Sequence, residues 1–172
     1  MEPPALLDLS PQRTTPVLAD GDVVLWESSI ILDYLDERYG PEVLLGRDPA
    51  LRARARSVQY YSDRIVGPAL REVIFEKRDK PEADWDQARI EKGMAGWRQC
   101  MAYLEAWLDG APFFADRFSV AECALLPRFG LAELYGAGVD ATFPGLFAWY
   151  EASRERPSFR TSHPRHMAPV SD

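Results

Sequence analysis

The sequence predicts a small α/β unit followed by an all-helical domain, and three observations carry this prediction. Residues 15–39 read as strand, tight turn, strand and amphipathic helix. Residues 40–49 (GPEVLLGRDP) hold two glycines and two prolines, as linkers often do. Beyond them, apolar residues recur at helical spacing. We therefore divide the chain into a partial α/β domain, a linker, an all-helical domain and a flexible tail, over residues 1–40, 41–48, 49–160 and 161–172.

The α/β unit is expected to contain a hairpin and one helix. Strands over residues 15–20 and 22–26 have little more than Gly21 between them, which predicts an antiparallel hairpin. The helix begins at Glu27 or Ser28 and stops at Gly40-Pro41. Its apolar face is expected to hold Ile30, Ile31, Tyr34 and Leu35, and its polar face Asp33, Asp36, Glu37 and Arg38. Residues 3–10 would add one or two helical turns.

The helical domain carries clear start and stop signals. Asp48-Pro49 predicts an N-cap with proline in the first turn, opening a helix over residues 49–78. A second helix is expected over residues 84–109, ending before Gly110-Ala-Pro112. Ser119 and Glu122 have the spacing of a capping box, and they open a helix that Pro127 should bend. A last helix is expected over residues 144–155.

Composition narrows the classes of function. The 172-residue chain is 47% hydrophobic, which excludes a disordered protein. With a net charge of −7, the chain is not expected to have the basic face that nucleic-acid binding needs. We expect no membrane span or secretory signal, and we place the protein in the cytoplasm with Cys100 and Cys123 as reduced thiols. His163 and His166 lie in a Pro-rich tail, and no metal site is expected.

Two features of the α/β unit would suit a small peptide ligand. If the Thr15-Pro16 bond is cis, the backbone of Thr15 would turn its N–H and C=O outward to pair with an extended peptide. At Glu27-Ser28, free amides and a hydroxyl at a helix start would suit a ligand carboxylate. Each feature also has an ordinary structural explanation. Thr15-Pro16 could be a trans bond at the edge of a strand, and Glu27-Ser28 could be only a helix cap.

The order of these motifs resembles that of the cytosolic glutathione S-transferases. The resemblance rests on "TTPVLADGD", "LWESSIILDYLDERYG" and "FSVAECAL", and it covers about residues 4–160. It implies a thioredoxin-like N-terminal domain, truncated here, before an all-helical C-terminal domain. It also implies that the Thr15 backbone, with Pro16 cis, binds the cysteinyl part of glutathione, and that Glu27 and Ser28 hold its γ-glutamyl end.

The resemblance has further implications for the helical domain. Ser119 and Glu122 would be a folding element, whereas Tyr60, Tyr61 and Arg64 lie on a helix that would line the pocket for a hydrophobic electrophile. Packing in the core or an interface is the alternative for both tyrosines. Glutathione would be the co-substrate, without a metal, and the chain would form a homodimer.

The start of the sequence departs from this family. The family's first strand-helix-strand unit carries the catalytic Tyr, Ser or Cys and needs roughly 30 residues, but only fourteen precede Thr15. We expect that unit to be absent, so the catalytic residue is unknown and activity is left open. The chain is then a truncated transferase, a dimerisation module, or an adaptor similar to stringent starvation protein A, which binds RNA polymerase.

Overall fold

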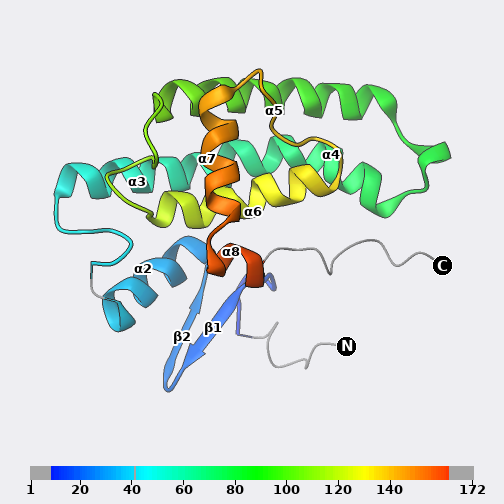
Figure 1. The fold of residues 1–172 in the computed structure, drawn as a ribbon. Helices are drawn as coiled ribbons and strands as arrows, with labels where there is room; N and C mark the ends of the chain where they lie inside the picture. The colour runs from blue at the N-terminus through cyan, green and yellow to red at the C-terminus, as the bar shows by residue number, and fades with distance from the viewer. Residues whose placement is uncertain (1–8, 41, 163–172) are drawn as a thin grey trace.

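The computed structural model describes residues 9–40 and 42–162, and it has the fold class predicted (Figure 1). A small β-hairpin and one helix precede a domain made of helices. The expected helical turns before residue 9 and the tail from residue 163, with His163 and His166, lie outside the described residues.

The hairpin consists of β1 (Val17–Asp20) and β2 (Val23–Trp26). The strands are antiparallel, and Val17 pairs with Trp26 at the open end while Asp20 pairs with Val23 at the turn. Gly21 has φ +59°, a backbone conformation that costs glycine little and that two-residue hairpin turns require. The predicted hairpin is therefore confirmed, with strands slightly shorter than expected.

The helix α2 (Ser28–Tyr39) follows the hairpin directly and is bonded to its tip. The carboxylate of Asp20 accepts hydrogen bonds from the hydroxyls of Tyr39 and Tyr34, the latter at 2.7 Å. These two bonds, first that from Tyr39, lower the pKa of Asp20. The hairpin is thus tied to α2 by polar contacts as well as by packing.

Two residues of α2 differ from the predicted amphipathic pattern. Ile31 is buried at 9% exposure, but Ile30 is 52% exposed because it lies in the first turn beside a cleft. Asp36, expected on the polar face, is only 4% exposed. Its carboxylate accepts hydrogen bonds from the backbone N–H groups of Leu44 (2.7 Å) and Leu45 (3.2 Å), so it joins α2 to the linker.

The first long helix of the helical domain is interrupted. In place of one α-helix over residues 49–78, the chain forms α3 (Pro49–Tyr61), a five-residue π-helix η1 (Ser62–Val66) and α4 (Gly67–Asp79). A short 3₁₀ turn η2 (Glu82–Asp84) leads into the other helices. These are α5 (Gln87–Leu108), α6 (Val120–Leu134), α7 (Pro144–Arg154) and α8 (Pro157–Ser162).

Side-chain caps explain where several helices begin. Asp48 accepts hydrogen bonds from Ala50 N–H (2.8 Å) and Leu51 N–H (3.1 Å) at the start of α3. Asp86 caps α5, which is why this helix begins at Gln87 instead of the expected residue 84. The predicted capping box of Ser119 and Glu122 opens α6.

Aromatic side chains at the centre of the helical domain form its core. Trp97, Phe129 and Trp149 are buried, and the ring of Phe129 lies 5.0 Å from that of Trp97 and 5.1 Å from that of Trp149. α4 packs on α5, α3 on α6, and α5 on α7. Figure 1 shows the hairpin and α2 on one side of this helical body. None of the described helices combines the length and apolar character that a membrane span requires.

Candidate functional site

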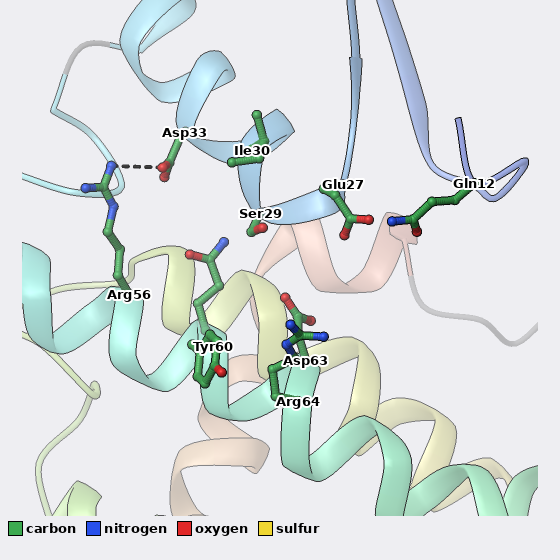
Figure 2. Close-up of a pocket in the computed structure, with 10 residues that line it drawn as sticks. Gln12, Glu27, Ser29, Ile30, Asp33, Arg56, Tyr60, Asp63 and Arg64 are labelled. Atoms are coloured by element: carbon green, nitrogen blue, oxygen red, sulfur yellow. Dashed lines mark hydrogen bonds and ion pairs between the residues drawn. The ribbon is translucent and has the colours of Figure 1, made fainter. Parts of the chain in front are cut away.

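A cleft of ≈ 640 Å³ separates the start of α2 from the helix segment α3–η1 (Figure 2). This volume lies within the range of about 300–1,000 Å³ typical of ligand pockets. The α/β unit and the helical domain both contribute side chains to it. The lining residues are Gln12, Glu27, Ser29, Ile30, Asp33, Arg56, Gln59, Tyr60, Asp63 and Arg64.

The N-terminus of α2 opens beside this cleft without a side-chain cap. Glu27 occupies the N-cap position with φ +72°, and its side chain makes no capping bond. The first N–H bonded within the helix is that of Ile31, which donates to the carbonyl of Glu27 at 3.0 Å. The N–H groups of Ser28, Ser29 and Ile30 therefore have no partner within the helix, and the helix dipole adds a partial positive charge there. Such a helix start suits an anionic group of a ligand.

The peptide bond between Thr15 and Pro16 is cis, as the resemblance to the family led us to expect. Both residues are exposed and immediately precede β1. Because Val17 pairs with Trp26, Thr15 and Glu27 lie at the same end of the hairpin. The two features predicted to hold a peptide are thus neighbours, although Thr15 and Pro16 do not line the cleft itself.

Most charges around the cleft are already paired. Arg56 donates to the Oδ2 atom of Asp33 at 2.8 Å, drawn as a dashed line in Figure 2. Asp63 accepts from Arg128 at 3.3 Å. The side chains of Glu27 and Arg64 have no hydrogen bond or ion pair within the described part of the chain; the guanidinium of Arg64 lies 5.8 Å from the centre of the Tyr60 ring. One carboxylate and one guanidinium therefore remain available to a ligand.

The π-helix η1 forms part of the cleft wall through Asp63 and Arg64. The N–H of Gly67 donates to the carbonyl of Ser62, five residues earlier. Pro68 has no N–H, so the carbonyl of Asp63 has no donor in this pattern. Single π-helical turns within α-helices occur frequently at functional sites, and this one lies where the cleft is.

The structure separates the predicted substrate residues Tyr60 and Tyr61. Tyr60, 64% exposed, lines the cleft with Arg64. The ring of Tyr61 packs instead against Tyr103 (6.3 Å) and Trp107 (6.2 Å). Burial raises the pKa of the Tyr61 hydroxyl well above its usual value. Only Tyr60 of the two is placed to touch a ligand in this cleft.

Of the other predicted residues, Ser28 lies near the cleft, whereas Ser119 and Glu122 lie in the helical domain away from it. Ser28 is exposed at the start of α2, and its neighbour Ser29 lines the cleft. Ser119 and Glu122 are buried and bonded to each other in the capping box, as a folding element requires.

Sequence reasoning did not identify seven other lining residues as members of the site: Gln12, Ser29, Ile30, Asp33, Arg56, Gln59 and Asp63. Asp33 was assigned only to the polar face of its helix. The Gly67-Pro68 pair was the one available signal, because a proline within a helical pattern disturbs the helix just before it.

Comparisons with known proteins identify the family. A model described as the glutathione S-transferase N-terminal domain matches residues 1–43. Glutathione S-transferase GstB of Escherichia coli K12 is 31% identical over 158 residues, which cover 90% of this chain and 75% of that protein. The chain belongs to the glutathione S-transferase family.

Two further relatives bear on the site of this glutathione S-transferase family member. The theta class enzyme of Xanthomonas axonopodis pv. citri, solved with glutathione bound, has a TM-score of 0.85 at 28% identity and covers 94% of this chain and 78% of its own. The stringent starvation protein A homolog of Coxiella burnetii is 27% identical over 158 residues, covering 91% of this chain and 72% of its own. Within residues 9–40 and 42–162, no group of three His, Cys, Asp or Glu could hold a metal ion.

Proposed function

We propose that this protein binds glutathione at the start of α2. The observation that carries the proposal is the uncapped helix N-terminus, with the unpaired acid Glu27, opening beside a ligand-sized cleft. The free N–H groups and Ser28 take the carboxylate of the γ-glutamyl end, and Glu27 takes its ammonium. The backbone of Thr15, at the same end of the hairpin, pairs with the cysteinyl part. The theta class relative solved with glutathione supports this assignment.

Isothermal titration calorimetry with glutathione tests the proposal. We expect measurable binding by the wild-type chain and a weakening of about 5-fold or more in Ser28→Ala, because one hydrogen bond to a charged group is lost. Ser57→Ala is the matched control, since Ser57 is exposed on α3 and its hydroxyl donates to the carbonyl of Ala53. An absence of glutathione binding by the wild-type chain contradicts the proposal.

The finer activity in this proposal is conjugation of the glutathione thiolate to a hydrophobic electrophile. Tyr60 and Ile30 are exposed apolar side chains at the cleft and would contact such a molecule. The reaction also needs a donor that stabilises the thiolate, and we assign no residue of this chain to that role. We further propose a homodimer in the cytoplasm, which sedimentation velocity of the purified chain tests for assembly.

A second candidate function is that of a non-enzymatic adaptor. The similarity to the stringent starvation protein A homolog favours it, and the net charge of −7 suits a protein partner with a basic surface. Affinity purification with the tagged chain would then retrieve RNA polymerase subunits. Their absence, together with glutathione binding, would favour the transferase assignment.

A further inference from the structure

A groove of ≈ 370 Å³ lies between α7 and the loop that joins α5 to α6. It shares no lining residue with the cleft at the start of α2, and its volume falls within the range of ligand pockets. The loop contributes residues 110–113, and Figure 1 shows this loop running beside α7. From α7 come Gly145, Ala148 and Ala152, whose spacing places them on one face of the helix. Because these side chains are small, they leave room between the helix and the loop.

The indole of Trp149 lines this groove with an unused hydrogen-bond donor. Trp149 is only 3% exposed, and its ring packs on those of Phe114 (5.4 Å) and Phe129 (5.1 Å). Its Nε1 atom nevertheless has no acceptor among the residues that the structure describes. By contrast, buried Trp97 donates its indole N–H to the carbonyl of Ala137 at 2.8 Å. Since buried polar groups are almost always paired, the Trp149 N–H is a candidate contact for a ligand.

Arg156 brings a positive charge to the same groove. Its Nε atom is buried without an acceptor, and its guanidinium forms no ion pair within residues 9–40 and 42–162. The nearby Arg154 and Arg160 are each paired with a glutamate. The Arg156 guanidinium instead stacks on the ring of Phe118, 3.9 Å from its centre, a contact that favours one orientation of this flexible side chain.

We propose that this groove binds a small carboxylic acid with a compact apolar body, such as an arylacetate. The guanidinium of Arg156 and the indole N–H of Trp149 donate to the carboxylate. The apolar body lies between the small residues of α7 and the loop residues Pro112 and Phe113. This second site is separate from the cleft at α2, and the inference does not depend on the proposed function.

The lining of the groove selects this class of ligand over others. Arg156 and the indole of Trp149 can only donate hydrogen bonds, so the ligand has to supply acceptors. No acid is among the described residues that line the groove, and the planar guanidinium matches a carboxylate. A neutral hydrocarbon would leave both donors unpaired. A fully hydrated anion such as phosphate would gain nothing from the apolar side chains of Phe113 and Ala148.

Three probe molecules separate the charge from the apolar body. Phenylacetate has both, phenylacetamide is a neutral molecule of nearly the same shape, and acetate lacks the ring. Each is titrated into the full chain labelled with nitrogen-15, and the tryptophan indole N–H signals are followed by NMR. The signal of Trp149 is the one that disappears in Trp149→Phe.

Two pairs of variants test the assigned contacts. Arg156→Gln is compared with Arg71→Gln, because Arg71 is also exposed in part and stacks on a phenylalanine, at 5.8 Å, but does not line the groove. Ala152→Leu fills the groove from an exposed position on α7, and its control is Ala95→Leu at an exposed position on α5.

We expect phenylacetate to shift the Trp149 indole signal and to bind about 10-fold or more tightly than phenylacetamide or acetate. Arg156→Gln should weaken phenylacetate binding about 10-fold or more, and Ala152→Leu should abolish it, whereas both controls should bind as the wild type does. Trp149→Phe, followed on the backbone N–H signals of α7, should weaken it about 5-fold. If Trp149→Phe does not fold, the other two variants carry the test.

Four results would overturn the inference. The first is a Trp149 signal that phenylacetate does not move, and the second is equal affinity of Arg156→Gln and Arg71→Gln. The third is phenylacetamide binding as tightly as phenylacetate, because the carboxylate would then not be recognised. The fourth is a set of shifts centred on Ser29 and Tyr60, which would place the acid in the cleft at α2. Glutathione titration of Arg156→Gln should match that of the wild type, so the two proposals stand or fall separately.

Discussion

The capping box at the start of α6 predicts an unequal pair of mutational effects. Glu122 is fully buried and accepts three hydrogen bonds: from Phe114 N–H (2.9 Å), from Ser119 N–H (2.8 Å) and from the Ser119 hydroxyl (2.8 Å). It therefore joins the loop before α6 to the helix itself. Ser119 contributes a single further capping bond, accepted from Ala121 N–H at 3.2 Å.

The expected loss of stability follows from these contacts. Glu122→Ala leaves two buried backbone N–H groups without an acceptor, and each costs about 1–3 kcal/mol, so the free energy of unfolding falls by about 2–6 kcal/mol. Ser119→Ala keeps the Glu122 carboxylate as acceptor and costs about 1 kcal/mol, the usual loss for an N-cap. Against a total of about 5–15 kcal/mol, the first change is severe and the second mild.

Thermal denaturation followed by circular dichroism measures both changes. For a chain of this size, each kcal/mol lowers Tm by about 2–4 °C, so Glu122→Ala should melt roughly 4–24 °C below the wild type. If Glu122→Ala does not fold, Glu122→Gln gives the comparison, because it retains one acceptor oxygen. A loss for Ser119→Ala equal to or larger than that for the Glu122 variant would refute this assignment of the bonds.

Two further predictions concern titratable groups. Hydrogen bonds from Lys80 and then from Asp86 N–H lower the pKa of buried Glu76 below its ordinary value of 4.5, so this carboxylate stabilises the fold above about pH 4.5 and loses its effect as the pH falls through the lowered value. The urea midpoint of the wild type should therefore be higher than that of Glu76→Gln at neutral pH, and the difference should shrink in acid. A difference that stays the same at both pH values would contradict this prediction. Burial raises the pKa of Cys123 to about 11 and also raises that of Cys100, so both thiols should react slowly with a disulfide reagent at about pH 8 and fast in denaturant, and rapid labelling of the native chain would show this to be wrong.

The elements of the fold could be predicted because their signals are local in the sequence. Gly21 between two apolar runs specified the hairpin, and Asp48-Pro49 and Ser119-Glu122 each marked a helix start that the structure confirms. Such caps and turns depend on residues within one helical turn of each other. The prediction was wrong where a segment outside the helix determines burial. Asp36 was expected on the polar face of its helix, but the backbone N–H groups of Leu44 and Leu45 fold back and donate to its carboxylate.

The cleft could be predicted only in part, for a related reason. Glu27 and Ser28 could be proposed from the sequence because a helix start is visible in one short segment, whereas the facing wall belongs to residues some 30 positions later and depends on how the α/β unit packs on the helices. The direction of that wall also depends on η1. An α-helical pattern through residues 49–78 takes no account of the extra residue that the π-turn inserts, and it therefore cannot tell which residues from Ser62 onward face α2. The charges show the same limit. The sequence places two arginines, Arg56 and Arg64, on one predicted helix, and the pairing of Arg56 with Asp33, which only the fold shows, leaves Arg64 as the unpaired cation at the cleft.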